Sequence, residues 1–127
     1  MKEKKVSVRT HRELDVWKKS IDFVTKLYKE TVDFPKQEAY GITNQIRRAA
    51  ISIPSNIAEG AARDSNKEYI RFLYIALGSI AEIETQLIIA NNLHYFDDEA
   101  FKELEEDRDE IAKMLYGLIR YRKSLLK

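Results

Sequence analysis

The chain has 127 residues, of which 44% are apolar and 34% are charged, and it contains four glycines, two prolines and no cysteine. This length predicts one domain with its own hydrophobic core, and the absence of cysteine excludes disulfides and thiolate metal sites. The formal net charge of +1 gives no overall case for nucleic-acid binding, which has to depend on where the charges lie. No apolar run approaches the roughly 18 residues of a membrane span, and the basic N-terminus lacks the apolar region of a signal peptide, so we expect a cytoplasmic protein that does not enter a membrane.

Residues 1–12 are basic and poor in apolar side chains, which predicts a flexible arm that carries Arg9 and Arg12. The first helix is predicted over residues 13–32, where apolar side chains recur every three or four residues. Pro35 follows this segment, and the residue before a proline is disfavoured in a helix. The first helix is therefore expected to end shortly before this proline.

The second predicted helix, residues 42–60, is the least regular part of the chain. Its apolar stripe consists of Ile42, Ile46, Ala49, Ile53 and Ile57. Pro54 lies within this stripe, where it removes a backbone donor and crowds the carbonyl of Ala50. Either Pro54 bends one continuous helix, which we favour, or Ser52 caps a separate short helix with the proline in its first turn. Gly60 is predicted to be the C-terminal glycine of the segment.

Two longer helices complete the predicted fold. Ser65 followed by Glu68 is a capping box, and it marks the start of a third helix over residues 66–92. A fourth helix is predicted over residues 98–123, and a short basic tail, residues 124–127, follows it. No segment alternates in the manner of a β-strand. The sequence therefore predicts an all-α fold, an antiparallel up-down-up-down four-helix bundle with its second helix bent at Pro54.

The third helix is apolar over more than one face. Tyr74, Ile75, Gly78 and Ile89 lie on a second face, and Gly78 permits close approach. These residues either pack under the second helix or form an interface between subunits. Because exposed apolar patches usually mark association sites, we favour the interface.

Charge is distributed unevenly along the fourth helix. Residues 97–110 contain nine acidic and two basic side chains, a net of −7, whereas residues 113–127 contain five basic and no acidic side chains, a net of +5. In an up-down-up-down bundle both termini and the connection between the second and third helices share one pole. The basic candidates for nucleic-acid binding at this pole are Arg9, Arg12, Arg63, Lys67, Arg71, Arg120, Arg122 and Lys123. The pole either contacts a phosphate backbone or is a solvated surface with mobile tails.

Four polar residues of the second helix are candidates for contacts with a partner or a neighbouring subunit. Arg47 and Arg48 are suited both to phosphate and to interface ion pairs, and the sequence does not separate the two. Asn56 and Glu59 lie one turn apart beside the apolar stripe. They either receive a partner or form a polar network in which Glu59 pairs with Arg63 at i,i+4, and we favour the network.

The sequence lacks the groupings that catalysis in a helical bundle needs. A di-iron site uses Glu-x-x-His pairs, and neither His11 nor His94 follows a glutamate at that spacing. Ser52 and Ser55 have no histidine near them in sequence, and we expect their hydroxyls to bond carbonyls that Pro54 frees. A glycine-rich phosphate loop is also missing. We therefore expect no enzyme, with no catalytic residue, no metal site and no cofactor.

Three blocks of the sequence carry a resemblance to a known family. They are LDVW at residues 14–17, QIRRAAISIPSNIAEG at 45–60 and EYIRFLYIALGSIAEIETQL at 68–87. Over about residues 12–123 the chain resembles the four-helix-bundle proteins encoded in intervening sequences of large-subunit ribosomal RNA genes. The resemblance implies a cyclic homo-oligomer, a pentamer. It also implies relatedness to accessory proteins of diversity-generating retroelements, whose pentamers bind nucleic acid and a reverse transcriptase.

Two functions follow as expectations. The first is a non-enzymatic homo-oligomeric bundle that binds the backbone of RNA or DNA through its basic pole. The alternative is a structural or adaptor protein that binds another protein, such as a reverse transcriptase, through the surface of the oligomer.

Overall fold

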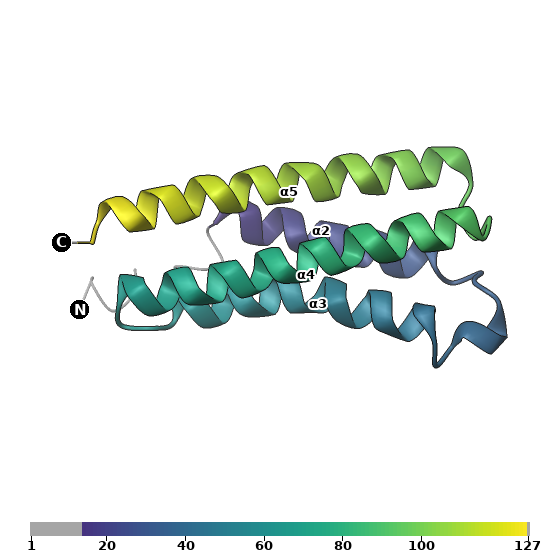
Figure 1. The fold of residues 1–127 in the computed structure, drawn as a ribbon, viewed down its shortest axis with the longest axis horizontal. Helices are drawn as coiled ribbons and strands as arrows, with labels where there is room; N and C mark the ends of the chain where they lie inside the picture. Colours follow the sequence, from purple (N-terminus) through teal and green to yellow (C-terminus); the bar gives the residue numbers. More distant parts are fainter. Residues whose placement is uncertain (1–13, 127) are drawn as a thin grey trace.

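Four α-helices and one short 3-10 helix make up residues 14–126, the part of the chain that this computed structural model describes (Figure 1). They are α2 (Asp15–Glu30), η2 (Lys36–Glu38), α3 (Ile42–Ala61), α4 (Asn66–Asn92) and α5 (Asp98–Ser124). No strand occurs within these residues. The prediction of an all-α protein with four helices is confirmed, and the predicted arm, residues 1–12, lies outside the described part.

Each helix packs against two neighbours, in the order α2, α3, α4, α5 and back to α2 (Figure 1). Contacts between distant residues give the direction of the helices. Lys26 Nζ lies 2.6 Å from Glu103 Oε1, and Lys19 Nζ, earlier in α2, lies 3.2 Å from Glu110 Oε1, later in α5. These two helices therefore run in opposite directions around a common core, as four-helix bundles require.

The core is made of apolar side chains from all four helices. In each helix these residues recur every three or four positions, so they form one face that turns inward. The largest fully buried apolar side chains are Phe23, Leu27, Ile46, Ile53, Ile57, Leu73, Ile83, Leu87, Leu104, Ile111 and Leu115. Burial of one such side chain stabilises a fold by about 1.5–3 kcal/mol. The inward faces therefore fix how the helices lie against one another.

Pro54 lies inside α3, which continues from Ile42 to Ala61 without interruption. The alternative in which Ser52 caps a separate short helix is therefore wrong, and the bend at Pro54 stays a prediction. The proline is buried, and its neighbours in the apolar stripe, Ile53 and Ile57, are fully buried. Packing of this face compensates for the backbone hydrogen bond that the proline removes.

Gly60 has a different role from the one that its position in the sequence indicated. It lies within α3 rather than after it, and no glycine among the described residues has a positive φ. A Cβ atom at this position would lie 2.9 Å from Cβ of Phe72 and 3.1 Å from Cδ1 of Tyr69. Gly60 therefore allows α4 to approach α3 closely, and it does not cap the helix.

The two ends of the bundle differ in how many helices reach them (Figure 1). α2 has 16 residues and α5 has 27, which at about 1.5 Å per residue makes α2 shorter by roughly 16 Å. Lys19, near the start of α2, pairs with Glu110, so the last turns of α5 extend beyond α2. Among the described residues, that end consists of α3, α4 and α5.

The opposite end is closed by aromatic side chains. The ring of Phe34 lies 5.1 Å from the ring of Tyr95 and 5.1 Å from that of Phe96. The hydroxyl of Tyr95 donates to Oε2 of Glu38 at 2.9 Å, and this hydrogen bond raises the pKa of Tyr95. These contacts connect η2 to the segment between α4 and α5.

Part of the acidic run of α5 is neutralised inside the chain. Lys19 lies 3.4 Å from Asp107 and 3.2 Å from Glu110, and Lys26 lies 2.6 Å from Glu103 and 3.7 Å from Asp107. The hydrogen bond that Lys19 donates to Glu110 raises the pKa of Lys19, and the one that Lys26 donates to Glu103 raises the pKa of Lys26. These carboxylates therefore hold α5 against α2 in addition to giving one end of the molecule its negative charge.

By length and composition alone, α4 is sufficiently apolar to cross a membrane, with a mean hydropathy of 1.5 over its most apolar window. Of that window 44% is buried, and α4 packs on both α3 and α5. A core helix of a bundle meets the same criterion, so this property does not place the protein in a membrane. The absence of a membrane span stays a prediction.

Candidate nucleic-acid interface

At one end of the bundle α3 ends, α4 begins and α5 ends (Figure 1). Six basic residues belong to these segments. We call this end the basic pole, and its described cations are Arg63, Lys67, Arg71, Arg120, Arg122 and Lys123. Arg122 is half-buried and the other five are exposed. Arg9 and Arg12, the other two candidates, lie outside the described residues. The structure thus brings together candidates from α4, from α5 and from the connection between α3 and α4.

The start of α4 is fixed by its cap. Ser65 Oγ accepts a hydrogen bond of 3.1 Å from the amide of Glu68, as the capping box predicts. The carboxylate of Glu68 in turn lies 3.1 Å from Nη2 of Arg71. The cap therefore sets where α4 begins, and it places Lys67 and Arg71 in the first two turns at the basic pole.

Aromatic rings support three of the guanidinium groups at this end. Arg63 and Arg71 lie over the ring of Phe72, with Cζ 4.8 Å and 4.5 Å from its centre. Cζ of Arg122 lies 4.3 Å from the centre of the Tyr69 ring. Each such contact contributes about 0.5–1 kcal/mol at exposed sites. A guanidinium that is already ordered loses less entropy when it binds a ligand.

The cations of the pole differ in whether a carboxylate neutralises them. Arg63 lies 3.4 Å from Glu59, and Arg71 pairs with Glu68. Within residues 14–126 no carboxylate lies within 4.0 Å of the other four, which are Lys67, Arg120, Arg122 and Lys123. The pole therefore carries positive charge that the described part of the chain leaves uncompensated.

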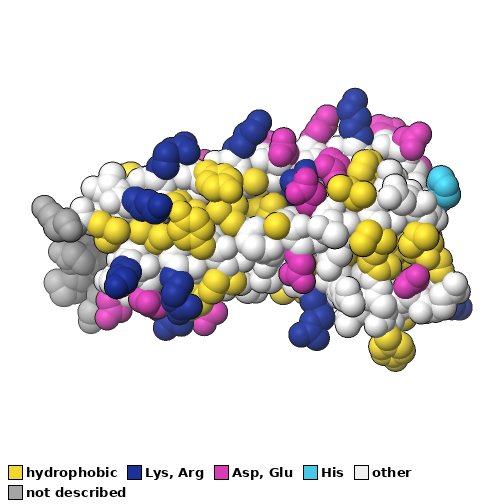
Figure 2. All heavy atoms as spheres, viewed as in Figure 1, with side chains coloured by type: hydrophobic (Ala, Val, Ile, Leu, Met, Phe, Trp, Pro, Cys, Tyr) yellow, Lys and Arg dark blue, Asp and Glu magenta, His cyan; other side chains and the backbone are white. Residues whose placement is uncertain are grey.

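Lys123 connects the basic pole to the exposed side of α4. Its Nζ donates a hydrogen bond of 2.9 Å to the hydroxyl of Tyr74 and lies 5.3 Å from the centre of that ring. Figure 2 shows Lys and Arg side chains around an exposed apolar patch near this end of the molecule. A tyrosine beside an ammonium group is a surface that suits both bases and phosphates.

Arg47 is held by contacts inside the chain. Its Nε donates to Oγ1 of Thr31 at 2.9 Å, its Nη2 donates to the carbonyl of Tyr28 at 3.1 Å, and its Cζ lies 4.5 Å from the centre of the Tyr28 ring. The guanidinium therefore satisfies groups at the C-terminal end of α2, where carbonyls have no helical partner. Arg48, in contrast, is exposed.

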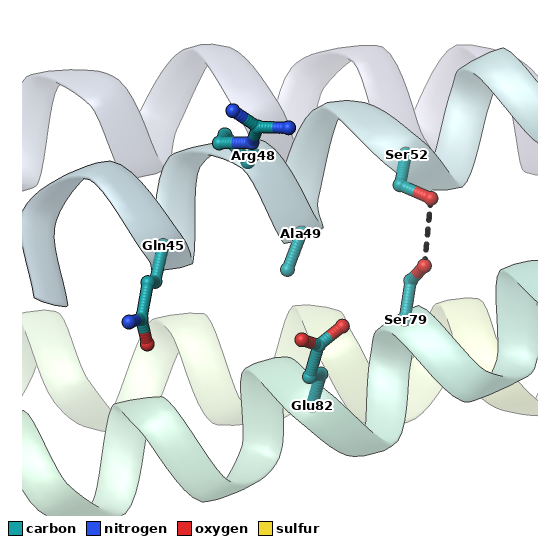
Figure 3. A pocket seen from close by; sticks show the side chains of 6 residues that line it. All are labelled: Gln45, Arg48, Ala49, Ser52, Ser79 and Glu82. Atoms are coloured by element: carbon teal, nitrogen blue, oxygen red, sulfur yellow. Dashed lines mark hydrogen bonds between the residues drawn. The ribbon is translucent and has the colours of Figure 1, made fainter.

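A polar pocket of about 240 Å³ lies between α3 and α4 (Figure 3). Gln45 and Ser52 of α3 face Ser79 and Glu82 of α4, whereas the guanidinium of Arg48 points away from Glu82 (Figure 3). The hydroxyl oxygens of Ser52 and Ser79 lie 2.7 Å apart. This hydrogen bond joins the two helices at their centre.

The contacts of Ser52 differ from the expected ones. Its hydroxyl was expected to bond a carbonyl that Pro54 frees, but it contacts Ser79 and accepts from Nδ2 of Asn56 at 2.9 Å. Neither partner is a base, so this hydroxyl is not activated as a nucleophile. Nδ2 of Asn56 also donates to the carbonyl of Ser52 at 2.8 Å. Asn56 therefore belongs to a polar network inside the chain, and the expected pair of Glu59 with Arg63 is present beside it.

The outward side of α4 carries exposed apolar side chains toward both of its ends, with exposed Glu82, Glu84 and Thr85 between them. Tyr74, Ile75 and Ile89 are 46%, 41% and 45% exposed, and Ile88 beside them is similar. A Cβ atom at Gly78 would meet nothing within 4 Å, so no contact inside the chain requires a glycine there. We call this surface the α4 face. The structure shows that it does not pack under α3, which was one of the two alternatives for these residues.

The fold and its charged end define the class of protein: a four-helix bundle with a basic pole and an exposed apolar helix face. Residues 12–117 match the family described as 23S rRNA-intervening sequence protein, and the chain belongs to this family. The predicted resemblance is therefore confirmed.

A solved structure resembles the chain over most of its length. It is a crystal structure of a protein with unknown function from the S23 ribosomal protein family of Bacteroides thetaiotaomicron VPI-5482. The two chains are 31% identical with a TM-score of 0.74, and the match covers 82% of this chain and 97% of that chain. No curated protein matches the chain.

Two residues of the basic pole have roles that sequence reasoning missed. Neither Tyr69 nor Asn66 is among the candidate residues that the sequence indicates. In the structure Asn66 Oδ1 accepts a hydrogen bond of 3.0 Å from Nη1 of Arg122, whose guanidinium lies on the Tyr69 ring. The one signal in the sequence was a tyrosine, rather than a phenylalanine, on the apolar stripe at the start of α4.

Proposed function

We propose that this protein is a non-enzymatic homo-oligomeric bundle that binds the phosphate backbone of RNA or DNA through its basic pole. The observation that carries the proposal is the set of four cations at the pole, Lys67, Arg120, Arg122 and Lys123, without a carboxylate within 4.0 Å among residues 14–126. Cations that face phosphate release condensed counterions, and this release supplies most of the affinity of non-specific binding. The proposal places the protein in the cytoplasm.

Assembly would multiply this effect. The resemblance implies a cyclic oligomer, a pentamer, and the α4 face offers the apolar surface that association needs. If the axis of the oligomer is parallel to the helices, the basic poles form a ring on one side. A ring of poles contacts several phosphates of one strand at the same time, which raises the apparent affinity above that of a single pole.

The proposal is tested by measuring the affinity for a labelled single-stranded RNA and a labelled DNA duplex over a series of salt concentrations. Each neutralised phosphate contributes about −0.7 to −0.9 to the slope of log K against log salt. Four uncompensated cations predict a slope of roughly −3 or steeper. Absence of binding to either nucleic acid at low salt would exclude the proposal.

A second candidate function rests on the α4 face. Its exposed apolar side chains suit a protein partner as well as another copy of the chain. In that case the protein is an adaptor, and the resemblance points to a reverse transcriptase as the partner. Co-elution of the protein with a purified reverse transcriptase at high salt, without nucleic acid, would favour this function over the first.

A further inference from the structure

A hollow of about 230 Å³ lies at the basic pole between the α3–α4 connection, the first turn of α4 and the end of α5. We call it the pole pocket, and the residues that matter for its chemistry are Arg63, Asp64, Ser65, Asn66, Tyr69 and Arg122. Its volume is several times the ~30 Å³ that one water molecule occupies in the liquid. A phosphate group and its ester oxygen fit within it.

Two buried polar atoms at this pocket have no hydrogen-bond partner. Tyr69 is 3% exposed, and its hydroxyl has no hydrogen-bond partner within 3.5 Å, although the Arg122 guanidinium lies close enough to interact with it. Nε of Arg122 is also buried without a partner. Buried polar atoms in folded proteins are nearly always paired, so two unpaired donors on residues that line one hollow favour a ligand that accepts hydrogen bonds. Burial raises the pKa of Tyr69 although Arg122 opposes the rise, so the hydroxyl keeps its proton at neutral pH.

The pocket also receives the N-terminal end of a long helix. α4 has 27 residues, and Ser65 Oγ accepts from the amide of Glu68 in its first turn. The amides of Asn66 and Lys67 precede it and have no carbonyl within the helix to bond. Free amides and the positive end of the helix dipole make such a terminus favourable for an anion.

The guanidinium of Arg122 is oriented before any ligand binds. It lies 4.3 Å from the centre of the Tyr69 ring, and its Nη1 donates to Oδ1 of Asn66 at 3.0 Å. No carboxylate among the described residues neutralises it. The planar fork of an arginine matches the oxygens of a phosphate group, and Arg63, which is paired with Glu59, also lines the hollow.

One lining group opposes an anion. Asp64 also lines the pocket, and its carboxylate is set against Arg122 and the amide end of α4, since Arg63 is paired with Glu59. This opposing charge gives a further prediction, since its removal has to strengthen anion binding.

We propose that the pole pocket binds one phosphate group, held by Arg122, by the hydroxyl of Tyr69 and by the amide end of α4. The inference rests on the proposed function in one respect, which is that this phosphate belongs to a nucleic-acid strand. The other cations of the pole then contact neighbouring phosphates of the same strand. The pocket fixes the position of one phosphate, and the exposed cations add affinity without fixing a position.

The first arm of the test measures the affinity for a fluorescein-labelled single-stranded RNA at low salt. Arg122→Gln is expected to weaken binding about tenfold, and Tyr69→Phe several-fold, because each removes donors to a charged group. Arg120→Gln removes the same charge from an exposed position outside the pocket, and only about a threefold loss is expected. Asp64→Asn is expected to strengthen binding.

The second arm uses inorganic phosphate without nucleic acid. Phosphate should raise the thermal midpoint of the full chain above that in chloride at equal ionic strength, and this rise should be clearly smaller in Tyr69→Phe. The phenylalanine keeps the buried ring, so the variant is expected to fold.

The outcomes separate the pocket from the proposed function. If RNA binds but Tyr69→Phe and Arg122→Gln weaken it no more than Arg120→Gln, the pocket is wrong and the function stands. If RNA does not bind but phosphate gives a rise that depends on Tyr69, the pocket holds a free phosphate ester and the nucleic-acid function is wrong. If RNA does not bind and phosphate gives no rise in the thermal midpoint, both the pocket and the proposed function are wrong.

Discussion

At the scale of single residues, Gly60 decides how closely two helices approach. The α3–α4 contact is built around its missing side chain, since Phe72 and Tyr69 occupy the space where a Cβ would lie. Gly78, on the outward side of the other helix, has open space around it. The two glycines are therefore a matched pair, one in a contact and one outside every contact of the described chain.

We predict that Gly60→Ala destabilises the fold by about 1–3 kcal/mol, because the added methyl forces α3 and α4 apart. Gly78→Ala is expected to stabilise α4 by up to about 1 kcal/mol through helix propensity. Chemical denaturation at one fixed protein concentration measures both values. Equal effects in the two variants would show that the α3–α4 distance does not depend on Gly60.

Some of these residue roles can be read from the sequence, and others depend on packing. The Ser65 cap and the Glu59–Arg63 pair depend on spacing along one helix, and both occur as predicted. The role of Gly60 and the contact of Ser52 with Ser79 depend on which residue of another helix lies opposite. Periodicity within a helix gives its inward face, but it does not give the register between two helices.

At the scale of elements, α2 and α5 are held together by lysines as well as by apolar packing. Lys19 and Lys26 of α2 contact three carboxylates of α5. Hydrogen bonds donated to Glu110 and Glu103 raise the pKa of Lys19 and Lys26, so the folded chain holds these protons more tightly than the unfolded chain does. The stabilisation is therefore complete below the ordinary lysine pKa of 10.5 and is lost as the pH rises through the raised values.

We predict that Lys19→Met and Lys26→Met together lower stability at pH 8, by less than about 1 kcal/mol per pair because the pairs are partly exposed. The difference from the wild-type chain should disappear near about pH 12, where the lysines of the wild type are neutral. Tyr69 and Tyr95 titrate in both proteins, so the comparison isolates the lysines. A difference that persists unchanged at that pH would assign the effect to the apolar stems of the lysines.

The extents of the helices were predictable to within a few residues. Caps and periodicity place the starts of α3, α4 and α5 at residues 42, 66 and 98, where the structure has them. The first helix is shorter than its pattern predicted, Asp15–Glu30 rather than residues 13–32, and the expected loop contains η2. Hydrophobic spacing continues past the point where a helix ends, so the pattern alone does not give the last turn.

At the scale of the whole molecule, the α4 face and the basic pole lie next to each other. Lys123 and Tyr74 join them through one hydrogen bond. Assembly through the α4 face would therefore bring poles of several copies close together. This proximity connects the proposed oligomer with the proposed binding of nucleic acid.

We predict that Tyr74→Glu or Ile75→Glu lowers the mass of the particle in solution, because each places a charge in an apolar contact between copies. Light scattering coupled to size exclusion measures that mass. The control is Thr25→Glu, an exposed position on α2 that is far from the α4 face in sequence and belongs to another helix. A wild-type mass of one chain, or an unchanged mass in both α4 variants, would contradict assembly through this face.

The separation of charge between the two ends could be predicted from the order of the helices, whereas the pole pocket could not. The pocket depends on how the last turn of α5 packs against the first turn of α4, and this contact brings Arg122 onto Tyr69. A sequence gives the charges at each end of a helix, but it does not give which donor remains unpaired after packing.

The central claim is that nucleic acid binds at the basic pole, and reversal of charge at the two ends of the bundle tests it most directly. Arg120→Glu with Lys123→Glu changes the pole, and Lys36→Glu with Lys102→Glu makes the same change of charge at exposed positions of the opposite end. Binding of labelled RNA at low salt should weaken about thirtyfold or more in the first variant, which is about 2 kcal/mol, and less than about threefold in the second. Equal losses in the two variants, or no loss in the first, would contradict the claim.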